Sequence, residues 1–193
     1  MAWQFPKRII HPDDMLRFGE VEYDKFNLYY RNKYKIAKKL KPKTIVEIGV
    51  RAGYSAFAFL DAAPKAAYRG FDNNRGIDGG TKGLKFYAWA LQILAEKNVH
   101  ILNDYNSQEH ALLPINFAPD LMHVDADHSH DGCLNDLNLA KAHKAKHILV
   151  DDIDYIDSVR DAVNLFLNQN PTYGREYHKD CRGQCLITPV YKD

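Results

Sequence analysis

Hydrophobic and polar positions along this chain switch repeatedly between a short apolar run and a helical period, which predicts strands separated by helices. The apolar runs that end in Gly, Asp or Asn predict five strands, at residues 44–48, 67–71, 99–102, 121–124 and 147–150. Apolar residues at helical spacing predict helices at 21–40, 54–60, 84–97, 133–143 and 158–168, with further helical residues near 109–113. Strands that alternate with helices predict an α/β fold, with a mostly parallel, doubly wound sheet covered by helices on both faces.

The two ends of the chain extend this pattern. Residues up to about 42 predict a helical lead-in that Pro42 ends, and residues 174–190 predict a strand pair that adds an antiparallel edge. Residues 73–83 predict a polar, glycine-rich loop. The sequence contains no internal repeat, low-complexity tract or linker, so we expect one domain over residues 1–193.

The junction after the first strand is the most informative motif. Glu47, Gly49 and Gly53 form a Glu-x-Gly-x-x-x-Gly pattern, and Ser55 follows in the predicted helix. Open α/β sheets bind ligands at such a turn, where glycine brings the backbone close to the ligand. The spacing differs from the Gly-x-Gly-x-x-Gly of dinucleotide sites, and a carboxylate there would repel a pyrophosphate. The motif therefore favours a cofactor with a positive centre and no phosphate, with a purely structural turn as the alternative.

Acidic residues follow the next strands too. Asp72 comes about 20 residues after the glycine turn, which suits hydrogen bonds to the hydroxyls of a ribose. Asp104 and Tyr105 follow the third strand, where they could meet an adenine edge. For these positions the alternative is an ordinary turn or capping residue.

The fourth and fifth strands end in a cluster of Asp125, Asp127, His128, Asp151 and Asp152. If the two strands are neighbours, these carboxylates lie close together and repel unless a cation or proton intervenes. A Mg²⁺ ion, which prefers oxygen ligands, would relieve the repulsion. The alternative is helix capping by the aspartates. A histidine here could act as a general base, whereas a zinc site at His128 and His130 has no recognisable third ligand.

Composition narrows the function classes. The chain has 46% hydrophobic and 26% charged residues and a net charge of +1, so we expect no nucleic acid and no membrane partner. The six lysines between 33 and 43 are interpreted as a solvated helix face. Cys133, Cys181 and Cys185 suggest reduced thiols, with a bridge between the last two left open. The first residues have no apolar signal region, and we expect a cytoplasmic location.

With these residues identified, the chain resembles class I S-adenosylmethionine-dependent methyltransferases. Within them it is most similar to the metal-dependent sugar O-methyltransferases of the macrocin type, through residues 47–55, 123–130 and 148–152. The resemblance implies seven strands in the order 3-2-1-4-5-7-6, the last antiparallel. It also implies S-adenosylmethionine as cofactor, bound by residues at the strand ends. These are Glu47, Gly49, Gly53, Ser55, Asp72, Asp104 and Asp125.

The same resemblance implies a metal and a reaction. Asp125, Asp151 and Asp152 would hold the divalent ion, and Asp127 or His128 would be the base. The expected reaction moves a methyl group to a hydroxyl of a small molecule. Two rivals stay open: a module that binds S-adenosylmethionine without methyl transfer, and a nucleotide-sugar or NAD oxidoreductase. The acceptor is not identified by the sequence, and homo-oligomer formation stays open.

Overall fold

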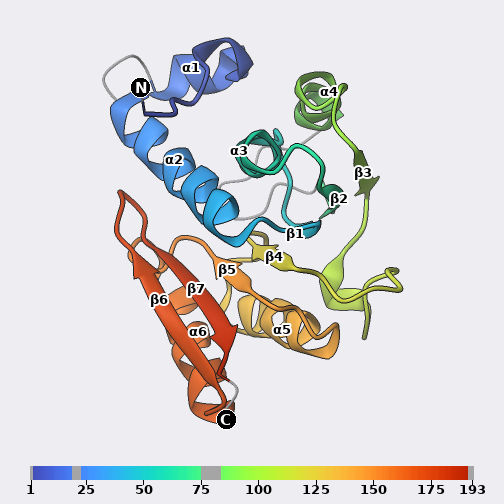
Figure 1. Cartoon of the computed structure of the whole chain (residues 1–193), viewed down its shortest axis with the longest axis vertical. Helices are drawn as coiled ribbons and strands as arrows, with labels where there is room; N and C mark the ends of the chain where they lie inside the picture. The colour runs from blue at the N-terminus through green and yellow to red at the C-terminus, as the bar shows by residue number, and fades with distance from the viewer. Residues whose placement is uncertain (1, 19–22, 75–83, 191–193) are drawn as a thin grey trace.

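Seven strands form one sheet in the order β3-β2-β1-β4-β5-β7-β6 (Figure 1). The computed structural model describes residues 2–18, 23–74 and 84–190. The strands are β1 (Thr44–Ile48), β2 (Ala67–Asp72), β3 (Val99–Asn103), β4 (Leu121–Val124), β5 (Ile148–Val150), β6 (Tyr173–His178) and β7 (Gln184–Pro189). β7 pairs antiparallel with both of its neighbours, and every other pair is parallel. The predicted sheet, including its strand order, is therefore confirmed.

Helices cover both faces of this sheet, as Figure 1 shows. The α-helices are α1 (Pro12–Phe18), α2 (Tyr23–Leu40), α3 (Tyr54–Ala62), α4 (Leu84–Ile93), α5 (His130–Ala142) and α6 (Asp157–Gln169). Short 3₁₀ turns occur at η1 (Lys7–Ile9) and η2 (Ser107–Glu109). Helices α2, α3 and α4 pack on one face, and α5 and α6 pack on the other. The candidate site lies at the carboxyl edge of this layered sheet, where the loops after β1, β4 and β5 meet.

Several predicted boundaries differ from the structure for local reasons. The helical residues predicted near 109–113 are wrong: η2 ends at Glu109, and His110 is extended. Pro114 closely follows, and a residue before proline avoids the helical region. Helix α5 begins three residues earlier than predicted because the Ser129 hydroxyl caps the Gly132 amide. The glycine-rich loop predicted at 73–83 and the predicted helix start at Val21 fall largely outside the described residues.

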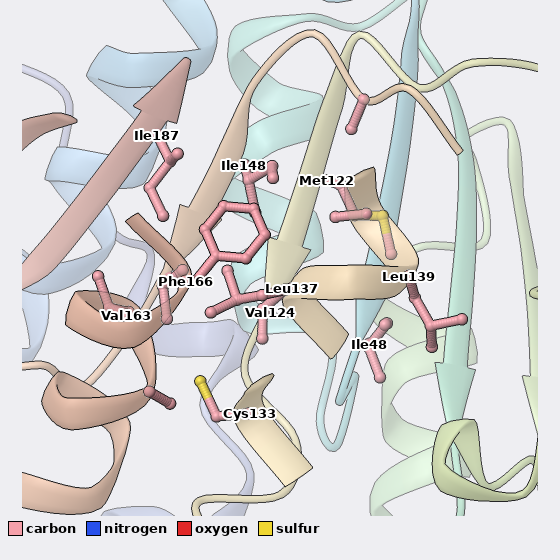
Figure 2. Close-up of a cluster of buried hydrophobic side chains, with 14 of the residues drawn as sticks. Ile48, Met122, Val124, Cys133, Leu137, Leu139, Ile148, Val163, Phe166 and Ile187 are labelled. Carbon is pink, nitrogen blue, oxygen red and sulfur yellow. The ribbon is translucent and has the colours of Figure 1, made fainter. Parts of the chain in front are cut away.

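The core beneath the site lies between the sheet and α5 and α6 (Figure 2). Met122, Val124 and Ile148 from β4 and β5 meet Leu137 of α5 and Phe166 of α6. All five side chains are buried. Burying side chains of this size contributes about 1.5–3 kcal/mol each, so this packing holds the ends of β4 and β5 at fixed positions.

A second buried feature beside α5 is a carboxyl group, Asp136. Gln108 Nε2 donates to its Oδ1 at 3.2 Å, and its Oδ2 has no partner among the described residues. Burial raises the pKa of Asp136 to about 7, with a smaller contribution from Asp127 and against hydrogen bonds from neighbouring side chains. The folded protein therefore favours the protonated acid.

Unfolding should consequently become easier as the pH rises from about 4 to 7. In that interval the unfolded chain ionises Asp136 while the folded chain holds its proton, which costs up to about 4 kcal/mol. Asp136→Asn should remove this part of the pH dependence and stabilise the protein at pH 8. Urea unfolding across pH 4–8 measures both effects, with exposed Asp161→Asn as the control. A parallel pH dependence in wild type and Asp136→Asn would contradict the assignment.

The structure also bears on the expected absence of a membrane-spanning helix and on the state of the three cysteines. Within the described part of the chain, no helix combines the length and the hydropathy that crossing a membrane requires. All three cysteines are free thiols, so the bridge left open between Cys181 and Cys185 does not form. Cys185 is buried in β7, whereas Cys181 is exposed.

Candidate active site

The glycine turn after β1 has the backbone that its sequence predicts. Gly49 and Gly53 have φ angles of 91° and 75°, and Arg51 between them has φ 46°. A Cβ added at Gly49 would lie 1.9 Å from the carbonyl oxygen of Asp125. The turn after β1 therefore presses directly against the loop after β4, and only glycine fits at this position.

Gly49→Ala should destabilise the protein by about 3 kcal/mol or more, because left-handed strain adds to a backbone clash. Gly53→Ala is the matched comparison. It carries similar strain, but its added Cβ would meet the Ala90 side chain at 3.0 Å. Urea unfolding should show the larger loss for Gly49→Ala, and equal losses would contradict the predicted clash.

Asp72, predicted to bind a ribose, braces the glycine turn. Its Oδ2 accepts from the amides of Val50 at 2.9 Å and Arg51 at 2.7 Å, and its Oδ1 accepts from the Asn74 amide at 2.7 Å. The carboxylate thus sits beside the turn, and its Oδ1 retains capacity for a further hydrogen bond.

The other predicted cofactor residues also lie around this edge. Asp104 is exposed with φ 60°. Tyr105 stacks on His110 with ring centroids 4.5 Å apart. Ser55 is buried in the first turn of α3. Asp104 and Tyr105 thus directly follow β3, and Ser55 lies in the helix that follows β1.

Helix α1 closes over the glycine turn through an ion pair that the sequence analysis did not predict. Arg51 donates to both carboxylate oxygens of Asp14, at 2.9 and 2.5 Å, and the Tyr54 hydroxyl donates to the same carboxylate at 2.8 Å. Asp14 is buried by these contacts. A bidentate pair of this kind fixes orientation as well as charge, so α1 is held against the turn.

A buried polar network runs under the site from β2 to α2. The Glu47 carboxylate accepts from the Tyr68 hydroxyl and pairs with His123 Nδ1 at 2.8 Å. His123 Nε2 lies 2.9 Å from Asp151 Oδ2, which also accepts from the Tyr29 hydroxyl at 2.5 Å. The network continues to the Lys33 ammonium, 2.5 Å from the same oxygen.

The charges within this network stabilise one another. Burial alone would lower the pKa of His123, but Asp151 and Glu47 raise it to about 10, so it is an imidazolium. Burial would raise the pKa of Asp151, but Lys33 and His123 hold it well below its usual range. Burial raises the pKa of Glu47 despite the hydrogen bonds from His123 and Tyr68. Because Glu47 is buried and paired with a cation, it would repel a pyrophosphate less than predicted. The spacing of the glycines is then the reason to exclude a dinucleotide site.

Above the network, Asp125, His128 and Asp152 form a more open group. Their ligand atoms lie within 4.8 Å of one another, and His128 Nε2 is 3.5 Å from Asp125 Oδ1 and from Asp152 Oδ2. Burial and the nearby Asp125 raise the pKa of Asp152 to about 6, although Arg182 opposes this at 3.2 Å. As predicted, β4 and β5 are neighbours, and this brings the carboxylates together.

These residues fit a divalent cation. Asp125, His128 and Asp152 supply ligand atoms within 4.8 Å of one another, whereas His123, which groups with Asp125 and Asp151, is an imidazolium without a lone pair for a metal ion. Asp151 Oδ1 is buried without a hydrogen-bond partner among the described residues, while its Oδ2 has contacts with Tyr29 and His123 and an ion pair with Lys33. A buried carboxylate oxygen without a partner is costly, and a cation beside it would remove that cost.

The remaining predicted residues take structural contacts. Asp127 Oδ1 accepts from the Ser129 amide at 2.8 Å, directly before α5. His130 Nδ1 pairs with Asp131 at 2.9 Å and belongs to neither group of ligand atoms found in the described chain.

The interpretation of residues 33–43 as a solvated face is wrong for Lys33, whose side chain has 0% exposure. Lys33 lies one helical turn from Tyr29 and Ile36 on the buried face of α2. This helical spacing could have predicted that Lys33 is buried, but the exposed lysines around it favoured the interpretation as a solvated face. The sequence analysis also did not predict roles for Arg182 and His123. The one sequence signal for His123 is that it is a polar residue within an apolar strand.

Comparison with protein families gives one match. A family model described as "Methyltransferase domain" matches residues 46–153, which is more than half of the chain. This span runs from the glycine turn through both groups of acidic residues. A search of curated proteins gives no match.

Solved structures share the fold at low sequence identity. The SAH-bound methyltransferase PaMTH1 of Podospora anserina aligns with TM-score 0.69 and 18% identity, covering 100% of this chain and 91% of that one. The O-methyltransferase TomG of Streptomyces achromogenes, in complex with SAM, has TM-score 0.62, 15% identity and coverages of 94% and 92%. An O-methyltransferase of Bacillus cereus, in complex with SAH, has TM-score 0.63, 13% identity and coverages of 96% and 84%. These likenesses confirm a Rossmann-like methyltransferase fold.

Proposed function

Because the chain belongs to the methyltransferase domain family, we propose that it moves a methyl group from S-adenosylmethionine to a hydroxyl of a small molecule. The proposal of a hydroxyl acceptor is supported by one observation, the acidic edge beside the glycine turn. Asp125 contributes to both features, since its backbone meets Gly49 and its carboxylate faces Asp152 and His128. A cofactor at the turn and an acceptor at the carboxylates would therefore lie next to each other.

S-adenosylmethionine supplies a methyl group already activated on a sulfonium, so the protein has to align the partners and provide a nucleophile. The turn is proposed to receive the methionine part: Gly49 and Gly53 give it its left-handed backbone, and Ser55 lies at the start of the following helix. Asp72 and Asp104 are proposed to face the ribose and adenine. Both carboxylate oxygens of Glu47 are engaged, by Tyr68 and His123. Glu47 is therefore proposed to position the turn that binds the cofactor and not to contact the cofactor directly.

A divalent ion, proposed as Mg²⁺, would be held by Asp125, Asp152 and the Oδ1 atom of Asp151. It would supply positive charge that lowers the pKa of an acceptor hydroxyl. His128 is proposed as the base, because its Nε2 faces these carboxylates and could take the hydroxyl proton there. Asp127 is the weaker alternative, since one of its oxygens is engaged at the start of α5.

Calorimetric titration of the purified chain tests the cofactor. We expect heat and a single site with S-adenosylmethionine and with S-adenosylhomocysteine, and none with NAD. Asp72→Asn should weaken the titration, whereas Asp161→Asn, at an exposed position on α6, should leave it unchanged. NAD binding with no response to S-adenosylmethionine would instead favour the oxidoreductase.

A further inference from the structure

Lys33 places an ammonium group in the protein interior, against a proposed metal ligand. Its Nζ lies 2.5 Å from Asp151 Oδ2 and 3.3 Å from the centroid of the Tyr29 ring. Neither Lys33 nor Asp151 has an exposed side chain. Burying an ammonium is costly unless it is paired, so its presence at this carboxylate calls for a physical role.

A need for hydrogen bonds to Asp151 does not explain why Lys33 is buried beside it. Asp151 Oδ2 already accepts from the Tyr29 hydroxyl and lies 2.9 Å from the His123 imidazolium. What Lys33 adds is a full positive charge on one oxygen of the carboxylate. The other oxygen, Oδ1, is the one without a partner in the described chain.

We propose that Lys33 sets the affinity of the acidic edge for a divalent cation, by repelling that cation across the Asp151 carboxylate. This inference rests on the proposed metal site. Like charges on opposite oxygens of one buried carboxylate interact strongly, because little water screens them. Arg182 supplies a second fixed charge at Asp152, 3.2 Å away. The edge is thus partly neutralised by the chain itself and binds the ion more weakly than bare carboxylates would.

Titration with Mn²⁺ alone, followed by the electron paramagnetic resonance of the free ion, tests the role of Lys33. Lys33→Met removes the charge, and Lys33→Gln removes the charge while keeping a hydrogen-bond donor. Both variants should bind Mn²⁺ about tenfold or more tightly than wild type. Lys35→Met is the control, because Lys35 is an exposed lysine on the same helix, and its affinity should match wild type.

The possible outcomes separate this inference from the proposed metal site. Binding to wild type that neither variant tightens contradicts the role of Lys33 and leaves the metal site standing. Binding only to the variants supports the role of Lys33 and removes the metal from the native protein. Binding to none of the proteins contradicts both. If the variants fold only when Mn²⁺ is added, that rescue supports the role, and failure of Mn²⁺ to rescue either one contradicts it.

Discussion

Replacing His128 with alanine is expected to lower the turnover number about 100- to 10,000-fold, the usual range for loss of a general base. The effect should be confined to chemistry, because the Nε2 atom of His128 faces Asp125 and Asp152 at the acidic edge. S-adenosylmethionine should therefore bind the variant as tightly as wild type. Steady-state methyl transfer and calorimetry on the same preparation measure the two quantities.

Two nearby variants make this prediction specific. Asp127→Asn keeps an oxygen that can accept from the Ser129 amide, so its turnover should fall less than about tenfold. His130→Ala removes a histidine that pairs with the exposed Asp131, and it should leave turnover unchanged. A large loss in Asp127→Asn together with an active His128→Ala would transfer the role of base to Asp127.

His123→Ala should give the largest loss of stability, about 3–5 kcal/mol in the free energy of unfolding. His123 is fully buried between two carboxylates, Glu47 and Asp151, at 2.8 and 2.9 Å. Its removal leaves the Glu47 carboxylate without its cationic partner, with the neutral Tyr68 hydroxyl still donating to it. An uncompensated charge in the interior costs more than the lost packing alone.

His147→Ala provides the control for this loss. His147 directly precedes β5 and hydrogen-bonds to a neutral partner, the Thr188 hydroxyl, at 2.9 Å. Losing one such bond typically costs about 1 kcal/mol. Urea unfolding near pH 7 compares the two variants, and a loss for His123→Ala no greater than for His147→Ala would show that the buried network contributes little to stability.

The layered fold was predictable because its signals are local. Short apolar runs ending in Gly or Asp locate the strands, and helical spacing locates the helices between them. Strand order is a different matter, since no local pattern states which strands pair. That order came from the family resemblance, and the structure confirms it.

The candidate site was predictable only where it follows strand ends. Asp72, Asp125 and Asp151 lie where the carboxyl edge of the sheet places them, because parallel strands end at one side. Lys33 and Arg182 could not be assigned in this way. They reach Asp151 and Asp152 from α2 and from the turn between β6 and β7, over 118 and 30 positions of sequence. Contacts of that kind depend on tertiary packing, which periodicity does not describe.

The glycine turn and the acidic edge are together proposed to move a methyl group to an oxygen. The most direct measurement follows a labelled methyl group from S-adenosylmethionine onto a panel of catechols and sugar diols, with Mg²⁺ and with excess chelator. We expect label on an acceptor oxygen with Mg²⁺, its loss with chelator, and its loss in Asp125→Asn. Tight cofactor binding with no labelled product from any acceptor would contradict methyl transfer and identify a binding module instead.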